Sequence, residues 1–277
     1  MKINIMTDSL KPNLAAMKIS AFHKAMGDEV FLNFPLIKAD FTYASILFSW
    51  TEDPHADLIG GPKYPPFKLD PEIESMKPDY DLYPHIDYSL GYTYKACPRT
   101  CDFCIVPKQK NDEKHYSIWD FHDPKFKKIC LLNNNTLADL NWRETFQEII
   151  DANLIYIDEN GIDLRLLTEE MADYIVKLRI DNMLHCAWDF IEHEQEVLKG
   201  ITLLKKAGFR MNKLMPYVLI GHSTTNEEDL YRVTKIRELG ANPFVMPKNK
   251  HDDYQRRFAR WVNHKAIFKT VKWEDYR

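Results

Sequence analysis

Short apolar segments of strand length alternate with segments of helical periodicity along most of this chain. Ala15, Ile19, Phe22 and Met26 recur at helical spacing, and Gly27 can end that helix in the left-handed conformation. Apolar runs before and after this helix have the length of strands. Strand, helix, strand order implies an α/β fold with parallel sheets.

The first 85 residues predict a small Rossmann-like α/β unit. Its last strand precedes a turn at Gly60, Gly61 and Pro62. The proline-rich stretch 64–83 is typical of a linker, so we expect a domain over residues 1–85. The expected strands are 2–6, 29–34, 43–50 and 57–60.

A longer series of strands and helices follows, and it predicts a second domain over residues 86–247. Thr168 can cap a helix that starts with Glu169 and Glu170. Two further helices end before Gly208 and Gly240. Six such units suit either an open doubly wound sheet or a partial barrel, and periodicity does not separate these. The expected strands are 88–94, 128–133, 154–158, 183–188, 215–220 and 243–246.

Composition places the chain among globular proteins, with 45% hydrophobic and 28% charged residues in a length of 277. No stretch approaches the roughly 18 apolar residues of a membrane helix, and residues 1–7 lack the apolar core of a signal peptide. We therefore expect a cytoplasmic protein without membrane contact. Five cysteines, three of them within eight residues, favour a metal or redox site over a disulfide framework.

Cys97, Cys101 and Cys104 form the pattern CxxxCxxC directly after an expected strand. Ligand sites of β/α folds lie at such strand ends. Three thiolates on one short loop can hold three irons of a [4Fe-4S] cluster and leave the fourth iron open for a small ligand. A structural zinc site is the main alternative, and His115 can complete a Cys3His set.

These residues resemble the signature of the radical S-adenosylmethionine superfamily, in which CxxxCxxC follows the first strand of a partial (β/α)6 TIM-like barrel. Phe103 matches the aromatic residue before the last cysteine. The resemblance implies that the three cysteines ligate a [4Fe-4S] cluster and that S-adenosylmethionine binds its fourth iron. It further implies an external one-electron reductant of the flavodoxin or ferredoxin type, and a 5′-deoxyadenosyl radical that abstracts hydrogen from a substrate.

Other positions match the family by register along the strands. The family has a Gly-Gly-Glu-like element after the second strand, and this chain has three asparagines whose carbonyls can accept from an ammonium group. A polar turn is the alternative for the three asparagines, and a loop ion pair is the alternative for Arg165, which follows the third strand. The implied cofactor-binding residues are Phe103, Asn133, Asn134, Asn135, Arg165, Gly221, Val245 and Met246.

Substrate-facing groups are expected at the end of the fourth strand. Cys186 and Asp189 are the candidate catalytic residues, as a thiol hydrogen donor and a general base. Core packing is the alternative for Cys186 and for Trp188.

The N-terminal unit resembles a shortened form of the cobalamin-binding domain found before many such barrels. The DxHxxG histidine is missing, because the first strand is followed by Asp8, Ser9 and Leu10. Cobalamin binding through a histidine is therefore doubtful, and binding without that ligand stays open. The cysteine loop CxxxCxxCIVP also resembles methylthiotransferases, but no cysteine precedes Cys97, which argues against sulfur insertion.

Residues 248–277 form a basic, aromatic tail with nine Lys/Arg and four Asp/Glu, although the whole chain carries −4. Basic groups beside aromatic rings can bind nucleic acid, whereas packing of the aromatics onto the main domain is the alternative. The sequence thus predicts a radical S-adenosylmethionine enzyme with an unidentified substrate, and modification of a nucleobase or nucleic acid is one hypothesis for its reaction. A non-catalytic iron-sulfur protein or a zinc-stabilised α/β binding protein is the competing interpretation.

Overall fold

The computed structural model describes residues 1–276 and divides the chain into two compact units, Met1–Ile129 and Cys130–Arg277. The division falls inside one strand, β6 (Lys128–Leu131). Its position differs from the boundary at residue 85 that the proline-rich stretch predicts. Arg277, the last residue of the predicted tail, lies outside the described residues. The fold is α/β with parallel sheets, as expected.

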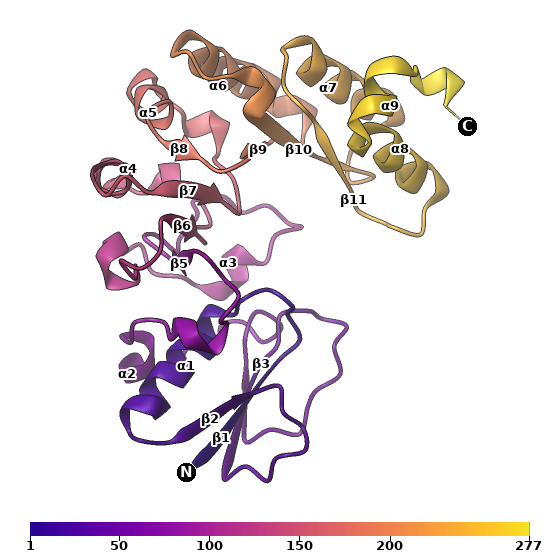
Figure 1. Cartoon of the computed structure of the whole chain (residues 1–277). Helices are drawn as coiled ribbons and strands as arrows, with labels where there is room; N and C mark the ends of the chain where they lie inside the picture. Colours follow the sequence, from indigo (N-terminus) through magenta and orange to yellow (C-terminus); the bar gives the residue numbers. More distant parts are fainter. Residues whose placement is uncertain (277) are drawn as a thin grey trace. The chain divides into compact units, whose positions relative to one another are not determined.

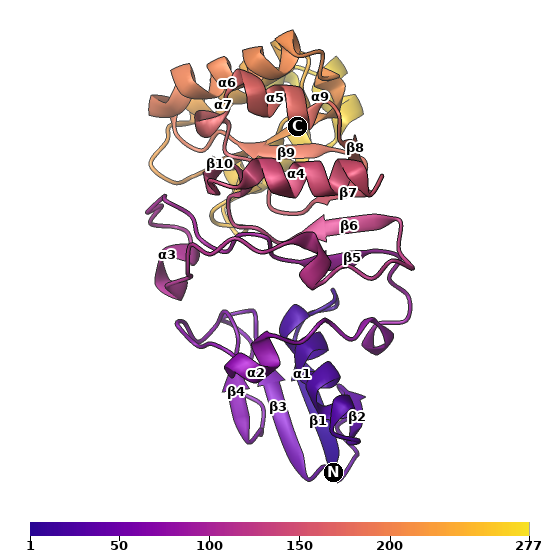
Figure 2. The ribbon, with the colours of Figure 1, turned by 90° about the vertical axis from the view of Figure 1, so that its left-hand side faces the viewer.

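Unit 1 begins with a four-stranded parallel sheet in the order β2-β1-β3-β4. Ile3 and Ile5 of β1 are fully buried against Ala16 and Ile19 of α1. Figures 1 and 2 show α1 and α2 on the same face of this sheet. The elements are β1 (Lys2–Thr7), α1 (Leu14–Ala25), β2 (Glu29–Leu32), β3 (Phe41–Ser45), β4 (Leu58–Gly60), α2 (Pro71–Glu74), β5 (Ser89–Gly91) and α3 (Val106–Gln109).

The stretch predicted as a linker packs onto the sheet of unit 1. Ile73 of α2 is 7% exposed and belongs to the same apolar cluster as Ile3 and Ile5. Asp79 accepts a hydrogen bond from Ser20 of α1 at 2.6 Å and pairs with Lys24. The stretch therefore packs on unit 1 through Ile73 and Asp79.

Unit 2 continues the alternation of strand and helix after β6. Figures 1 and 2 show α4 to α7 on one side of its strands. Thr168 caps α5, and Gly208 and Gly240 follow α6 and α7 with φ of +93° and +86°, which confirms these helix ends. The elements are α4 (Trp142–Asp151), β7 (Ile155–Asp158), α5 (Glu169–Ile175), β8 (Arg179–Ile180), β9 (Leu184–Ala187), α6 (Glu194–Lys206), β10 (Leu214–Ile220), α7 (Asn226–Glu238), β11 (Phe244–Pro247), α8 (Asp253–Asn263) and α9 (Lys265–Thr270).

The strands of unit 2 form two parallel groups. β6, β7 and β8 are neighbours in one sheet, and β9, β10 and β11 form a second sheet in the order β11-β10-β9. A single parallel bridge between Ile162 and Cys186 links the loop after β7 to β9. Backbone pairing therefore connects the loop after β7 to β9, and β9 to β10.

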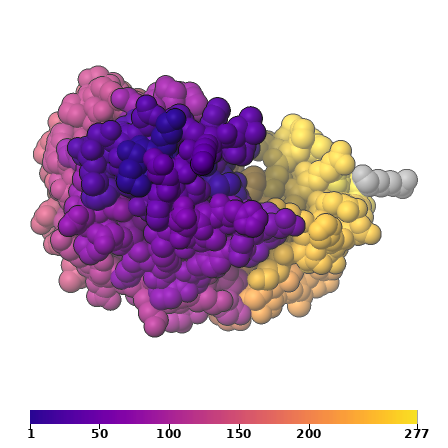
Figure 3. Space-filling model, turned by 90° about the horizontal axis from the view of Figure 1, so that it is seen from below, coloured from indigo at the N-terminus to yellow at the C-terminus, as the bar shows by residue number. Residues whose placement is uncertain are grey.

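The C-terminal tail folds into α8 and α9, which lie at the surface (yellow in Figure 3). Phe258, Trp261 and Phe268 are at most 4% exposed. Trp273 packs on Tyr254, Phe258 and Trp261 with ring centroids 5.0 to 5.7 Å apart. These rings pack on one another within the tail, and Phe268 also contacts Arg237 of α7 at 4.9 Å from its ring centroid. Nucleic acid binding by the tail stays a prediction.

Asn263 of α8 completes the edge of the second sheet. Its Oδ1 accepts from the backbone N–H of Val245 at 2.7 Å, and its Nδ2 donates to the carbonyl of the same residue at 3.0 Å. A side chain thus pairs with the backbone N–H and carbonyl of Val245 on the edge strand β11, and covering an edge in this way protects it. No helix within residues 1–276 is long and apolar enough to cross a membrane.

Candidate functional site

The CxxxCxxC loop lies in unit 1, between β5 and α3. Cys97, Cys101 and Cys104 are all half-buried. The backbone N–H of Cys104 donates to the carbonyl of Cys101 at 3.0 Å, which closes a turn around Asp102 and Phe103. The N–H of Val106 lies 3.5 Å from the Sγ of Cys104 and donates to it. The short CxxC spacing therefore places the last two cysteines at the two ends of one turn.

The start of the loop is fixed by backbone and charge. Tyr94 forms an antiparallel bridge with His115, and the N–H of Tyr116 donates to the carbonyl of Thr93 at 2.9 Å. The Nζ of Lys95 lies 2.5 Å from the Oε1 of Glu74 on α2. This ion pair ties the residue two positions before Cys97 to the helices of the same unit.

Lys18 of α1 binds the same carboxylate. Its Nζ lies 3.0 Å from the Oε1 of Glu74. Burial favours a higher pKa for Glu74, but Lys18 and Lys95 outweigh it and hold that pKa below its usual value. Glu74 is thus ionised near neutral pH and links α1, α2 and the cysteine loop.

Gly91 is the last residue of β5 and allows the strand to pass a buried aromatic ring. A Cβ at this position would lie 2.3 Å from the Cγ of Phe121. Phe121 is 4% exposed, so its ring is packed within the protein. The glycine is therefore required by the close approach of strand and ring.

We expect Gly91→Ala to destabilise the protein by about 1–3 kcal/mol through this overlap. Urea denaturation measures the change in the free energy of unfolding. In the Phe121→Leu background, where the ring is removed, Gly91→Ala should lower the free energy of unfolding less than it does in the wild type. A fully additive double-mutant cycle would show that the overlap is not the cause.

The three thiols suit an iron-sulfur cluster by their chemistry, since soft thiolates are its usual ligands. Within residues 1–276, no three His, Cys, Asp or Glu side chains converge as ligands of a single metal ion. Cysteines of a four-iron cluster each bind a different iron, so a cluster does not require that convergence. The donor set of the loop therefore fits a [4Fe-4S] cluster.

The three asparagines after β6 lie in unit 2. Asn133 and Asn135 are buried, and Asn134 is half-buried. The Nδ2 of Asn133 donates to the Oγ1 of Thr136 at 3.1 Å, and the Nδ2 of Asn135 to the Oδ2 of Asp163 at 3.5 Å. These contacts form a polar turn at the end of β6, and a role in cofactor binding stays a prediction.

Arg165 forms the loop ion pair that the sequence allows. Its Nε lies 2.7 Å from the Oδ1 of Asp163, and its Nη2 lies 3.1 Å from the Oδ2. The Nη1 lies 3.3 Å from the Nδ1 of His193. Asp163, Arg165 and Asn135 are thus brought together after β6 and β7.

Cys186 is on the buried face of β9. Its side chain is 1% exposed, and burial raises the pKa of its thiol well above the usual value. The neighbouring residues along the strand, His185 and Ala187, are on the opposite face. The position agrees with core packing of a protonated thiol, and hydrogen donation by Cys186 stays a prediction.

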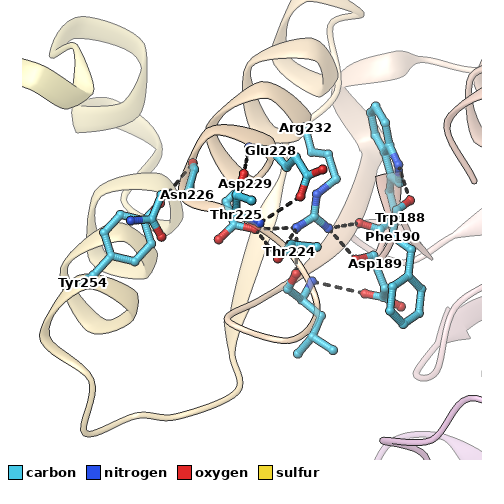
Figure 4. Close-up of polar contacts among 11 residues, drawn as sticks. Trp188, Asp189, Phe190, Thr224, Thr225, Asn226, Glu228, Asp229, Arg232 and Tyr254 are labelled. Carbon is cyan, nitrogen blue, oxygen red and sulfur yellow. Dashed lines mark hydrogen bonds and ion pairs between the residues drawn. The ribbon is translucent and has the colours of Figure 1, made fainter. Parts of the chain in front are cut away.

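Asp189 follows β9 directly and belongs to a polar network around Arg232 of α7 (Figure 4). Its Oδ1 accepts from the N–H of Leu219 on β10 at 3.1 Å, and burial raises the pKa of its carboxyl. Arg232 donates from Nη1 to the carbonyls of Trp188 and Asp189 at 2.7 and 2.8 Å. The ends of β9 and β10 are therefore held together by these two side chains.

Arg232 itself is fully buried. It pairs with Asp229 at 2.6 Å between Nη2 and Oδ1, and the same Nη2 donates to the carbonyl of Leu219 at 2.9 Å. The side chains of Arg232 and Asp229 are 0% and 1% exposed. Sequence reasoning missed this pair, because an i, i+3 Asp and Arg on a helix is typical of an exposed ion pair.

Gly221 has φ of +70°, and the space beside it is filled within the protein. A Cβ there would lie 2.2 Å from the Nε2 of Gln255 of α8. The close approach predicted for adenine is thus made by a side-chain amide in this structure. Val245 is 1% exposed and Met246 is 46% exposed, so the two lie on opposite faces of β11.

Asp158 at the end of β7 was also missed by sequence reasoning. Its carboxylate accepts from the backbone N–H groups of His185 and Gly161 at 2.7 and 3.1 Å. Burial raises the pKa of this carboxyl to about 6. The signal available in the sequence was a single acidic residue at the end of an apolar strand.

This raised pKa predicts a pH effect on stability. Between the unfolded value of 3.8 and about 6, the folded state binds more protons at Asp158 than the unfolded state. Stability contributed by this group therefore falls as pH rises through that window. Between pH 4.5 and pH 6.5, the urea midpoint should decrease less in Asp158→Asn than in the wild type. An equal decrease would contradict the assignment.

Neither a protein-family model nor a curated protein sequence matches the chain. The assignment of function thus depends on the cysteine loop and on the groups at the strand ends.

Proposed function

We propose that this protein is a radical S-adenosylmethionine enzyme. The observation that carries the proposal is the CxxxCxxC pattern on the loop after β5, in which Cys101 and Cys104 stand at the ends of one turn. Cys97, Cys101 and Cys104 would hold a [4Fe-4S] cluster. The strands from β5 onward would correspond to the partial (β/α)6 barrel of that superfamily.

When bound, the cluster would supply the electron for reductive cleavage of S-adenosylmethionine, the source of a 5′-deoxyadenosyl radical. The electron itself requires an external flavodoxin- or ferredoxin-type donor. The residues of the chain hold the loop in place. Glu74 fixes Lys95, and the N–H of Val106 donates to the Cys104 sulfur.

The polar groups after β6 and β7 would contact the methionyl part of S-adenosylmethionine. Arg165 carries a positive charge suited to a carboxylate, and the asparagine carbonyls suit an ammonium group. Both types of group are present in the Asn135, Asp163 and Arg165 cluster. Asp189 is the candidate proton-handling group on the substrate side.

Anaerobic reconstitution with iron and sulfide, followed by reduction in the presence of S-adenosylmethionine, tests the proposal. We expect a brown protein with about four irons per chain that forms 5′-deoxyadenosine. A brown protein that forms none would instead be a non-catalytic iron-sulfur protein. Zinc without a chromophore after anaerobic purification would favour the zinc-stabilised binding protein.

The nucleic acid hypothesis for the substrate depends on the outward basic residues of the tail. Arg256, Arg260 and Lys269 are exposed, whereas most aromatic rings pack within the tail. Binding would therefore be electrostatic, with little base stacking. Titration of oligonucleotides at two salt concentrations should show binding that weakens with salt, and no binding at low salt would remove the hypothesis.

A further inference from the structure

We propose that His185 is a proton-transfer residue of unit 2, with Asp158 as its positioning residue. The ring would take a proton through Nε2 from an acidic O–H or N–H group of the substrate. This inference rests on the proposed function, since it assigns a role on the substrate side of the same reaction. It goes beyond the family resemblance, which implies nothing for either residue.

The hydrogen bonds of His185 fix one tautomer of its ring. The Nδ1 lies 2.7 Å from the backbone carbonyl oxygen of Asp158, and a carbonyl oxygen only accepts. The Nδ1 must therefore carry the hydrogen and donate it. The Nε2 then holds the lone pair, and no hydrogen bond joins it to any group in residues 1–276.

Asp158 places a carboxylate beside the same ring. Its Oδ2 accepts from the backbone N–H of His185 at 2.7 Å and lies 3.8 Å from the Nδ1 of the ring. The N–H of Gly161 holds the other oxygen at 3.1 Å. The carboxylate therefore faces the ring whose Nε2 would take up the proton.

The ring of His185 lies on the half-buried face of β9 and β10. It stacks on Tyr217 with centroids 5.1 Å apart and an interplanar angle of 10°. Tyr217 in turn contacts Phe244 of β11, edge to face at 5.8 Å. Residues on this face alternate with the fully buried Leu184, Cys186 and Val218, which pack on the opposite side.

The side chain of His185 is 19% exposed, so the ring is held firmly but is not sealed in the core. The ionisable groups near it are Asp158 and Glu159 from the β7 side, Tyr217 from β10, and the protonated thiol of Cys186 on its own strand. Asp158 has the closest charge. The arrangement has the parts of an acid-base pair: a ring in a fixed tautomer, a positioned carboxylate and an accessible Nε2.

The step balances as a proton transfer. The substrate O–H or N–H bond breaks and its electron pair stays on the substrate, while a new N–H bond forms at Nε2. The imidazolium returns the proton to water or to the product, and no oxidant or reductant takes part.

Nitrogen-15 NMR of the full-length protein without iron or S-adenosylmethionine tests the tautomer. We expect the neutral ring of His185 to carry its hydrogen on Nδ1, although the Nε2–H form is the commoner one in water. His185→Gln identifies the signal, and exposed His251 is the reference. An Nε2–H ring at His185 would overturn the proposal.

Modification by diethyl pyrocarbonate tests the reactivity of Nε2 in the same protein. Peptide mapping should find His185 carbethoxylated, at a rate that changes at least about threefold in Asp158→Asn but not in His251→Gln. Loss of modification at His185 with normal modification at His251 would contradict an accessible lone pair. Because neither experiment needs a cluster, failure of the radical chemistry and failure of this assignment are distinguishable.

Discussion

Alanine in place of Cys97, Cys101 or Cys104 is expected to lower the iron content of the reconstituted protein from about four irons per chain to less than one. Three thiolates are the minimum that holds a site-differentiated cluster, so loss of one ligand removes most of its affinity. Formation of 5′-deoxyadenosine should fall to background in all three variants. Iron analysis and chromatography of the reaction mixture measure the two effects.

Cys130→Ala is the matched control for these variants. Cys130 is 3% exposed in β6 and acts as a small apolar side chain. This variant should keep its iron and its chromophore, with a modest loss of stability. Equal iron loss in Cys130→Ala and in the loop variants would mean that folding, and not ligation, controls iron binding.

Arg232→Met is expected to destabilise the protein by about 3–5 kcal/mol, because it leaves the Asp229 carboxyl and three backbone carbonyls without their buried donor. The effect should appear as a large shift of the urea midpoint. Because Arg232 joins the ends of β9 and β10, hydrogen exchange near residues 188 and 219 should accelerate as well.

Arg256→Met provides the comparison for this large effect. Arg256 pairs with Asp253 at the same i, i+3 spacing and the same 2.6 Å distance, but the two side chains are 65% and 89% exposed. Exposed pairs of this kind contribute little, so no measurable shift of the midpoint is expected. Similar shifts in the two variants would contradict the role assigned to burial.

The sequence predicts the parallel α/β class because apolar strand-length runs and helix caps are local signals. Thr168 and Gly240 act where expected, since a cap depends only on its own turn. The strand expected over 43–50 ends at Ser45 instead. The carboxylate of Asp8 accepts from the N–H groups of Leu47 and Phe48 at 2.8 and 2.9 Å, and these bonds replace strand pairing.

Long-range contacts explain what the sequence could not predict. The proline-rich stretch packs through Ile73 onto β1, and a local composition rule cannot detect such a contact. Arg232 and His185 make their contacts because β7, β9 and β10 end beside one another. The cysteine loop was visible in advance because its ligands lie within eight residues, whereas Asp158 and His185 lie 27 residues apart.

The most direct test of the central claim is electron paramagnetic resonance of the reduced, reconstituted protein with and without S-adenosylmethionine. If three cysteines hold the cluster and its fourth iron binds the methionyl group, addition of S-adenosylmethionine will change the spectrum of the reduced cluster. S-adenosylhomocysteine serves as the non-cleavable comparison. A cluster spectrum that stays the same at saturating S-adenosylmethionine, with no 5′-deoxyadenosine formed, would contradict the account.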